Sequence, residues 1–392
     1  MRILLLPQSY PPRVGGLEAV AHALAVQLAG RGHEVRVLTN RYPRDLPRHE
    51  VRDGIDVQRA LFLAPRAGLL ARWRLDLWLA SLPLAPAAGR RLRRLVEEFR
   101  PDVVNVHFPD AMIPFVLALR PAHRFRLVVS LHGHEVMRFG GAAARRDCRA
   151  LCRLLREADA VTACSGDLLD AAARLEPAAA ARGVVIHNGI DPARFEDATR
   201  FAHPRPYVLA LGRLTHKKGF DLLLEALARV APDHPGVDLV LAGEGEERPS
   251  LEAAAARLGL DRRVHFFGKA SPAEVVRLLN GCLFAAVPSR AEPFGIVALE
   301  ALAAGRPVLA TRVGGMAEFL ESLPAPAPVV LVRPDPEALA EGLRTGLRDG
   351  WPAPGGPALT ADIFREYSWS RVSRQYETVL AGRARVPATS GG

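Results

Sequence analysis

Short apolar stretches alternate with longer amphipathic stretches along the first half of the chain. The apolar stretches are rich in Val, Leu and Ile, which is typical of strands buried on both faces. Strands are predicted at Ile3–Leu6, Val35–Thr39, Val103–Val106, Leu127–Leu131, Ala160–Ala163 and Val184–Ile186. Helices are predicted at Leu17–Arg31, Gly89–Phe99, Ala142–Ala158 and Gly166–Leu175. This alternation predicts a parallel sheet with helices on both faces.

The second half repeats the pattern after a proline-rich, aperiodic segment at 192–206, which we interpret as a linker. Strands are predicted at Tyr207–Leu211, Val237–Ala242, Val264–Phe267, Leu283–Val287 and Pro307–Thr311. Helices are predicted at Phe220–Val230, Pro249–Leu258, Ala273–Leu279, Phe294–Ala304 and Trp369–Leu380. The predicted fold class is therefore α/β, with two domains, and the length of 392 residues suits two domains of ordinary size.

Charge is distributed unevenly between the halves. Residues 1–195 hold 29 Lys+Arg and 19 Asp+Glu, whereas the remainder holds 23 of each, so the first half carries the whole net charge of +10. A basic half suits an anionic partner, such as a membrane surface, but an arginine-rich composition alone would also explain it. No nucleic-acid-binding module is present, so nucleic acid is not an expected partner.

Residues 61–94 combine leucines, two tryptophans and many arginines. The pattern suits a helix lying at a membrane interface, and it equally suits a helix packed on the sheet with solvated arginines. No stretch reaches the roughly 18–20 apolar residues that span a bilayer, and no cleavage site follows the first apolar run. Four scattered cysteines favour a reducing compartment. We expect a cytoplasmic protein, with peripheral binding to the inner face of the membrane as a hypothesis.

The stretch from Val287 to Glu318 contains the strongest candidate chemistry. A predicted strand is followed by Glu292, and a predicted helix from Phe294 contains Glu300. The free amides at the start of such a helix attract an anion, typically a phosphate. Glu300 would lie roughly 9 Å along the helix, at about 1.5 Å per residue, which is the separation of a diphosphate from a ribose. The alternative is two ordinary glutamates on a solvated face.

This stretch resembles the E-x7-E signature of glycosyltransferase family 4, whose members have the GT-B fold. The resemblance continues, in the order of the family, through VIHNGID at 185–191, LALGRLTHKKGFDLLLEAL at 209–227, LVLAGEGEE at 239–247 and VHFFGKAS at 264–271. It implies two Rossmann-like domains that face each other across a cleft. The expected domains are an acceptor-binding domain at 1–195, a nucleotide-sugar-binding domain at 196–365, and a last helix with a tail at 366–392 that returns to the first domain.

Two cations are expected at the diphosphate of the donor. Arg213 follows a predicted strand and Lys218 precedes the next helix, which suits a bidentate arginine and a lysine point charge. They match the family segment G-R-L-x-x-x-K-G. Further donor contacts are expected from Gly243, from Lys269, and from the amides of Phe294, Gly295 and Ile296.

The resemblance also assigns roles to the remaining candidates. Gly15 and Gly16 match the glycine loop that lies against the phosphates and sugar of the donor. His132 matches a histidine beside the donor sugar, and Glu292 would orient that sugar while Glu300 holds the ribose. His134 and Glu135, which follow His132, are expected near the acceptor.

The predicted reaction is a retaining transfer of a sugar from a nucleoside-diphosphate sugar to a hydroxyl acceptor, such as a lipid-linked or cell-envelope glycan. Retention is implied by the resemblance. No D-x-D motif is present to hold a metal, so we expect no cofactor and no metal, with two fixed cations in their place. The alternatives are a GT-B epimerase or hydrolase, and an idle nucleotide-sugar-binding subunit. An oxidoreductase would need a G-x-G-x-x-G after an early strand, which is not found.

Overall fold

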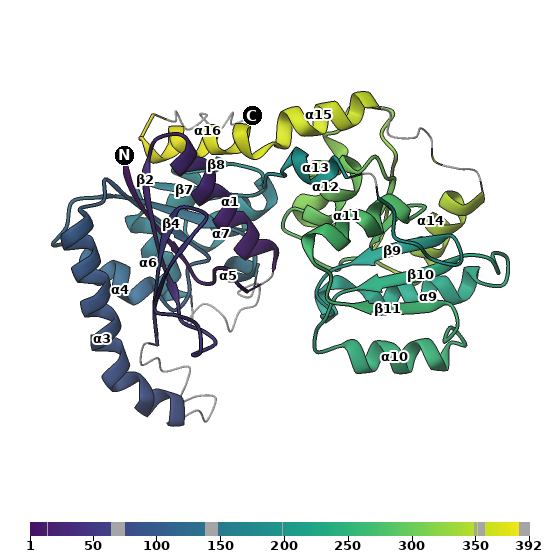
Figure 1. The fold of residues 1–392 in the computed structure, drawn as a ribbon, viewed down its shortest axis with the longest axis horizontal. Coiled ribbons are helices and arrows are strands. Elements are labelled where there is room, and N and C mark those ends of the chain that lie inside the picture. Colours follow the sequence, from purple (N-terminus) through teal and green to yellow (C-terminus); the bar gives the residue numbers. More distant parts are fainter. Residues whose placement is uncertain are drawn as a thin grey trace. The chain divides into compact units, whose positions relative to one another are not determined.

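A computed structural model of the chain describes residues 1–13, 15–63, 75–137, 148–197, 199–348, 351 and 357–383. The chain divides into two compact units. The first unit contains Met1–His187 and the last helix, α16 (Trp369–Leu380), and the second unit is Asn188–Ser368 (Figure 1). The boundary between the units falls after His187, eight residues before the boundary predicted between residues 195 and 196.

The first unit contains an eight-stranded sheet in the order β3-β4-β2-β1-β5-β6-β7-β8. Every neighbouring pair is parallel except β3 and β4, which are antiparallel. The strands are β1 (Arg2–Pro7), β2 (Glu34–Asn40), β3 (His49–Arg52), β4 (Ile55–Ala60), β5 (Val103–His107), β6 (Arg126–Leu131), β7 (Ala160–Ala163) and β8 (Gly183–Val185). The central strands are buried almost completely, as the continuous apolar runs predict.

The helices of the first unit connect these strands. They are α1 (Gly16–Gly30), α3 (Leu75–Phe99), α4 (Ile113–Leu119), α5 (His134–Met137), α6 (Arg149–Glu157), α7 (Gly166–Leu175) and α8 (Ala178–Ala181). The last helix, α16, packs beside α1, where Arg31 pairs with Glu377, and the Arg126 side chain donates to the Val379 carbonyl at 3.1 Å. These contacts join the end of the chain to its beginning.

The second unit contains a six-stranded sheet in the order β11-β10-β9-β12-β13-β14, with every neighbouring pair parallel. The strands are β9 (Tyr207–Leu211), β10 (Asp238–Ala242), β11 (Val264–Gly268), β12 (Ala285–Val287), β13 (Val308–Thr311) and β14 (Val329–Val332). The strand order reverses between β9 and β12, because β10 and β11 extend the sheet on one side and β13 and β14 on the other.

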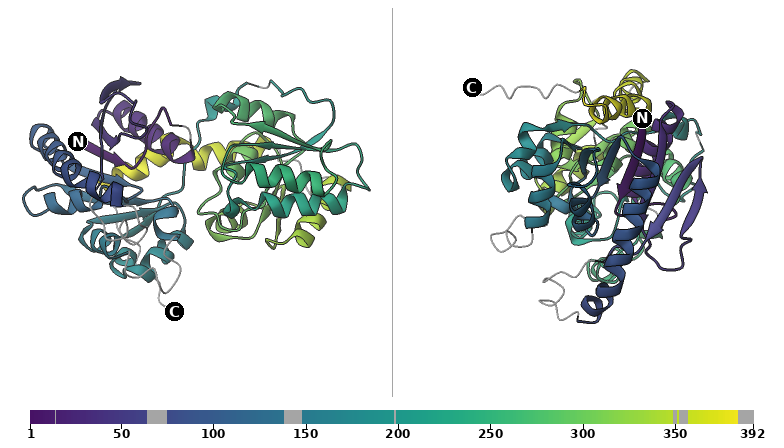
Figure 2. Two further views of the ribbon diagram at one scale, coloured as in Figure 1. Left: turned by 90° about the horizontal axis from the view of Figure 1, so that it is seen from below. Right: turned by 90° about the vertical axis from the view of Figure 1, so that its left-hand side faces the viewer.

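Helices cover both faces of this second sheet, as Figures 1 and 2 show. They are α9 (Phe220–Val230), α10 (Arg248–Arg257), α11 (Pro272–Gly281), α12 (Ile296–Ala303), α13 (Gly314–Glu321), α14 (Pro336–Arg348) and α15 (Pro357–Tyr367), with short 3-10 turns η2 (Pro192–Phe195) and η3 (His216–Lys218). Buried leucines of α9 and α14 pack on the sheet and form much of the core.

The predicted strands are all present, with ends that differ from the prediction by at most two residues. The pair β3 and β4 and the strand β14 were not predicted. The turn between β3 and β4 is Asp53-Gly54, where both residues have positive φ, of 49° and 78°. An Asp-Gly pair between alternating residues is a hairpin signal, so this element was detectable from the sequence.

Six helices depart from their predicted bounds, and three of them, α1, α10 and α11, do so by only one or two residues at each end. The helix predicted to begin at Phe294 begins at Ile296, and the helix predicted at Gly89–Phe99 extends back to Leu75. The helix predicted at Ala142–Ala158 is described as Arg149–Glu157 with Cys148 as its N-cap, and residues 142–147 of the prediction lie outside the described residues. Among the helices that the structure describes, none is long and apolar enough to cross a membrane.

Candidate functional site

The reversal of strand order in the second unit marks the candidate site. In open parallel sheets, ligands bind beyond the carboxyl ends of the strands where the order reverses. The loops that follow β9 and β12 are adjacent there. The first of them contains Arg213 and Lys218, and the second contains Glu292. The sheet topology therefore brings these three predicted residues to one edge of the second unit.

The two loops touch through their backbones. Gly219 lies in the left-handed region with φ +66°, and a Cβ added there would lie 2.1 Å from the Pro288 carbonyl oxygen. The backbone N–H of Arg290 also donates to the Lys217 carbonyl at 2.7 Å. Only glycine allows the two backbones to come this close, which explains why a glycine follows Lys218.

Arg290 clamps the loops together. Its guanidinium makes two hydrogen bonds to the Asp221 carboxylate, at 2.6 and 2.7 Å, and a third to the His216 carbonyl at 2.9 Å. A bidentate arginine–carboxylate pair fixes orientation as well as distance. The sequence analysis did not single out Arg290, because its partner lies far away in the chain.

Lys218 and Glu292 form an ion pair across the two loops. Lys218 Nζ contacts Glu292 Oε2, and the Ser289 hydroxyl donates to the same oxygen at 3.3 Å. Glu292 is 8% exposed. The sequence analysis placed a cation and a carboxylate near each other, and the structure shows that they are paired directly. The side chain of Arg213 is exposed, and no partner for it is found among the described residues.

The helix beyond Glu292 presents free amides. Gly295 has φ +89° and precedes Ile296, the first residue of α12, and the first intrahelical hydrogen bond runs from Leu299 N–H to the Gly295 carbonyl. The preceding amides of the first turn therefore lack intrahelical partners. The Phe294 ring is 1% exposed and lies against the rings of Phe319 and Tyr367, so Phe294 is a core side chain.

Glu300 is buried on α12 and pairs with a residue of the linker. Arg194 Nη1 lies 3.1 Å from Glu300 Oε1. Burial raises the pKa of Glu300, and Arg194 opposes that shift. The pKa of this carboxyl group is higher in the folded protein than in the unfolded chain, so ionisation is less favourable in the folded protein. Once the pH rises above the pKa of the unfolded chain, the group therefore lowers the free energy of unfolding.

Glu300→Gln is therefore expected to raise the unfolding temperature of the ligand-free protein near pH 7.5. The expected rise is about 2–4 °C for each kcal/mol gained in the free energy of unfolding. The gain should shrink as the pH falls towards 4 and below, because the carboxyl group of the wild type then becomes protonated in the unfolded state as well. Nucleoside diphosphates should bind more weakly to the variant. Thermal unfolding from pH 4 to 8 measures the first effect, and Glu246→Gln, at an exposed glutamate, is the control. A variant that is less stable than wild type at pH 7.5 would contradict the pKa argument.

Glycines line the ends of three adjacent strands. Gly212, Gly243 and Gly268 follow or end β9, β10 and β11, and all have positive φ. They are linked by backbone hydrogen bonds, from Gly212 N–H to Ala242 O at 3.0 Å and from Gly243 N–H to Gly268 O at 2.7 Å. Lys269 follows directly and is exposed. The predicted contacts at Gly243 and Lys269 thus lie on neighbouring loops at the same edge as Arg213.

In the first unit, Gly15 and Gly16 precede or begin α1, at the carboxyl end of β1. Gly15 is extended, with φ −179°, but a Cβ there would lie 2.4 Å from Glu18 Oε2. Glu18 is buried, and its Oε2 has no hydrogen-bond partner among the described residues. The sequence analysis did not name Glu18, although an acidic residue in the first turn of a helix after a glycine loop is a detectable signal.

His132 lies at the carboxyl end of β6, as predicted. Its Nε2 lies 3.0 Å from Nδ1 of His107, and its ring stacks on Phe108 with centroids 4.4 Å apart. His134 is exposed, whereas Glu135 is buried and accepts hydrogen bonds from the backbone N–H groups of His132 and Gly133. Oε1 of Glu135 therefore holds the loop, and the expected place of Glu135 near the acceptor stays a prediction.

Within the part of the chain that the structure describes, two clusters have spacing that a metal ion could use, and both contain a carboxylate that an arginine already neutralises. In His203–Asp238–His265, Arg205 and Arg263 lie 3.5 and 3.4 Å from Asp238 Oδ1. In His216–Asp221–Glu247, Asp221 pairs with Arg290. Arginine beside the carboxylate disfavours an added cation, so neither cluster fits a metal well.

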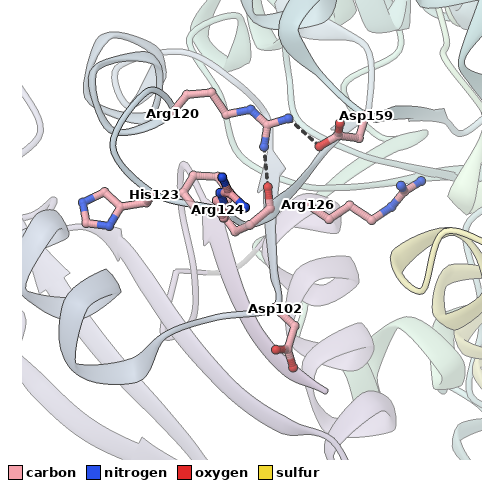
Figure 3. A pocket seen from close by; sticks show the side chains of 7 residues that line it. Asp102, Arg120, His123, Arg124, Arg126 and Asp159 are labelled. Atoms are coloured by element: carbon pink, nitrogen blue, oxygen red, sulfur yellow. Dashed lines mark hydrogen bonds and ion pairs between the residues drawn. The ribbon is translucent and has the colours of Figure 1, made fainter.

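An open hollow of about 640 Å³ lies elsewhere, at the amino ends of β5, β6 and β7 in the first unit (Figure 3). Two of its arginines have structural partners: Arg120 pairs with Asp159 at 2.6 Å and donates to the Phe125 carbonyl, while Arg126 donates to the Val379 carbonyl of α16. Part of the basic excess in the first half of the chain thus stabilises the fold.

Comparison with known proteins identifies the family. A family model described as Glycosyltransferase Family 4 matches residues 14–194, and one described as Glycosyl transferases group 1 matches residues 193–354. The glycogen synthase of Mycobacterium tuberculosis is 35% identical over 332 residues, which cover 81% of this chain and 80% of that protein. The chain belongs to glycosyltransferase family 4.

Further similarities agree with the family 4 assignment. The phosphatidyl-myo-inositol mannosyltransferase of the same organism is 30% identical over 409 residues, covering 100% of both chains. A crystal structure of HepE from Anabaena in complex with UDP and glucose has a TM-score of 0.73 at 23% identity, covering 97% of this chain and 99% of that one. The predicted family, the GT-B fold with two parallel-sheet domains, and the enzyme class of glycosyltransferase are confirmed.

Proposed function

We propose that this family 4 enzyme transfers a sugar from a nucleoside-diphosphate sugar to a hydroxyl acceptor, with retention and without a metal. The observation that carries the proposal is the pairing of Lys218 with Glu292 beside the start of α12. A cation, a carboxylate and free amides then lie at one strand-reversal edge, where a phosphate and the hydroxyls of its sugar can be bound together.

The chemical task is the departure of the nucleoside diphosphate from the anomeric carbon. Negative charge grows on the leaving phosphate, and preorganised cations and amides stabilise it. We assign this role to Arg213, Lys218 and the amides from Gly295 to Ala298. Glu292 would accept hydrogen bonds from the sugar, and the leaving phosphate itself would take the acceptor proton.

Three further parts of the molecule have proposed roles. Glu300 would hold the ribose through its second carboxylate oxygen, since Oε1 is engaged by Arg194. The loops at Gly243 and Lys269 would meet the nucleoside. In the first unit, Gly15, Gly16 and His132 would act on the donor, and this unit would also bind the acceptor.

A donor panel tests the proposed reaction. A nucleoside diphosphate that binds the folded enzyme should raise its unfolding temperature in proportion to occupancy, so UDP-, GDP- and ADP-sugars can be compared directly. With the stabilising donor and a hydroxyl acceptor, sugar transfer is expected, and it should proceed unchanged in EDTA. Loss of transfer in EDTA with recovery on adding Mg²⁺ or Mn²⁺ would contradict the metal-free mechanism.

Analysis of the products separates the alternatives. An epimerase would return an altered donor sugar, a hydrolase would release free sugar, and an idle subunit would bind the donor and leave it intact. A glycosylated acceptor whose new bond keeps the anomeric configuration of the donor is the expected result, and an inverted bond would refute retention.

The acceptor is proposed to be lipid-linked or part of a cell-envelope glycan. One relative is named for mannose transfer to phosphatidyl-myo-inositol, which is a lipid. In this chain, α3 runs past the edge of the first unit's sheet (Figures 1 and 2) and exposes Leu75, Leu79 and Leu82 by 54%, 52% and 46%. These positions lie on one helical face, and exposed arginines follow on the same helix. Residues 64–74 of the predicted segment lie outside the described residues.

Flotation with anionic liposomes tests this membrane hypothesis. The wild type is expected to float with the liposomes at low salt, and less so at high salt, because surface attraction is screened. Replacing Leu75, Leu79 and Leu82 together by Gln should reduce binding at least tenfold. Val51→Gln, at an exposed apolar side chain on β3, is the control. Absence of salt-sensitive binding by the wild type would eliminate the hypothesis.

A further inference from the structure

A chain of buried polar side chains runs beneath His132 in the first unit. Asn105 and His107 alternate on β5, so both point to the same face of the strand, and both are 0% exposed. Asn105 Oδ1 lies 2.7 Å from His107 Nε2, and His107 Nδ1 lies 3.0 Å from His132 Nε2. The three side chains therefore form a continuous hydrogen-bonded path that ends at a residue proposed to act on the donor.

The orientation of the Asn105 amide is determined by its surroundings. The amide group opposite Oδ1 lies 3.2 Å from the Val128 carbonyl oxygen and 2.9 Å from Ser130 Oγ. A carbonyl oxygen can only accept a hydrogen bond, so the nitrogen of the amide must face Val128. The oxygen of Asn105 must then face His107, and it must accept.

This orientation dictates the proton positions along the path. Since Oδ1 of Asn105 accepts, His107 carries its proton on Nε2, and its Nδ1 bears a lone pair. The neighbouring Nε2 of His132 must then carry a proton and donate it to His107. Burial lowers the pKa of His107 to about 3 and that of His132 well below its usual value, so both rings are neutral near pH 7. The lone pair of neutral His132 is therefore on Nδ1.

The rings are also held in place sterically. Phe108 stacks on His132 with an interplanar angle of 10°, and its own backbone has φ +54°, which is uncommon for a residue with a side chain. Tyr376 of α16 lies against His107, with ring centroids 6.2 Å apart. Ring rotation, which would exchange the two nitrogens, is thus opposed on both sides.

We propose that Asn105 and His107 are positioning residues that fix the tautomer of His132, so that Nδ1 of His132 is a permanent hydrogen-bond acceptor for a sugar hydroxyl. The inference rests on the proposed function only in assigning the ligand. No hydrogen-bond partner for Nδ1 is found among the described residues. Such a ring accepts from a hydroxyl group and cannot donate to a carbonyl or phosphate oxygen.

The protonation of the wild-type protein provides the first test. In protein labelled with ¹⁵N-histidine, protonated and unprotonated ring nitrogens have distinct ¹⁵N frequencies, and the signals of His132 are those lost in His132→Gln. At pH 7.5 the expected state is a proton on Nε2 and none on Nδ1. A proton on Nδ1 of His132 would overturn the proposal, and the protonation state itself is measured in the wild-type protein.

Asn105→Leu provides the second test, because leucine has a similar volume and no acceptor. The Nε2 proton of His107 then loses its partner, so a detectable fraction of His132 should move its proton to Nδ1. We expect kcat/KM for transfer to fall at least tenfold, with binding of the nucleoside diphosphate unchanged. Thr39→Val is the matched control and should change neither, because Thr39 is buried on β2 of the same sheet and its hydroxyl has no hydrogen-bond partner in the described part of the chain.

The outcomes separate this inference from the proposed function. If Asn105→Leu keeps a single Nε2 proton on His132 and wild-type kcat/KM, the positioning role is refuted. If the wild type shows the expected tautomer but transfers no sugar from any nucleotide sugar, the proposed function fails and the assigned proton positions stand. If transfer is normal but Nδ1 of His132 is protonated, only the positioning role fails.

Discussion

Lys218→Ala is expected to lower kcat/KM for sugar transfer by roughly 30- to 150-fold, the equivalent of about 2–3 kcal/mol of transition-state stabilisation. The substitution removes the ammonium group from the loop after β9. It also leaves Glu292, which is 8% exposed, without the cation that it contacts. An unpaired carboxylate at that place would repel the leaving phosphate. The substitution is therefore expected to lower the rate in two ways, by removing the attractive ammonium group and by leaving a repelling carboxylate.

Steady-state kinetics with the donor identified by the panel would measure the effect. Lys217→Ala is the matched control, because Lys217 is the adjacent lysine and its side chain is exposed. The double variant Lys218→Ala with Glu292→Gln removes both charges. If the unpaired carboxylate contributes, Lys218→Ala should cost less when Glu292 is already Gln than in the wild-type background. Wild-type rates in Lys218→Ala would refute the proposed role of the lysine.

Gly243→Ala is expected to destabilise the second unit by about 3 kcal/mol, near the upper end for a single substitution. Gly243 has φ +147°, and a Cβ there would lie 1.8 Å from the Gly212 carbonyl oxygen. Backbone of both loops would have to move, and this movement would displace Arg213, which follows Gly212. Donor binding should weaken in parallel, because the cation would no longer be held at the strand-reversal edge.

Urea unfolding and nucleoside diphosphate binding would measure these two effects. Gly236→Ala is the control, since a Cβ at Gly236 has no atom within 4 Å. Equal unfolding midpoints for the two variants would show that the loops after β9 and β10 adapt easily, which contradicts the close approach seen between them.

The sequence was sufficient for those features that depend on local patterns. Every strand predicted from the sequence is present, because continuous apolar runs separated by amphipathic helices are compatible with few structures other than a buried parallel sheet. The family 4 motifs also located Arg213, Lys218, Glu292 and Glu300 on the loops and helix where the second unit places them. The hairpin at Asp53-Gly54 was missed only because its turn signal was overlooked.

Contacts between distant residues required the tertiary structure. Lys218 and Glu292 are separated by 74 positions, and Asp221 and Arg290 by 69, so no local spacing links either pair. The start of α12 at Ile296 follows from Gly295 in a left-handed conformation and from the burial of Phe294 against Tyr367. Helix propensity alone placed that start two residues too early.

The first unit shows the same division between local and tertiary information. The sequence by itself determined that His132 ends a buried strand and that a helix closes the chain. Only the folded sheet decided that Asn105 and His107 lie under that histidine, and that α16 brings Tyr376 against the His107 ring. The physical reason is that hydrogen-bond partners and ring contacts are selected by strand register and helix docking, which depend on the packing of the whole unit.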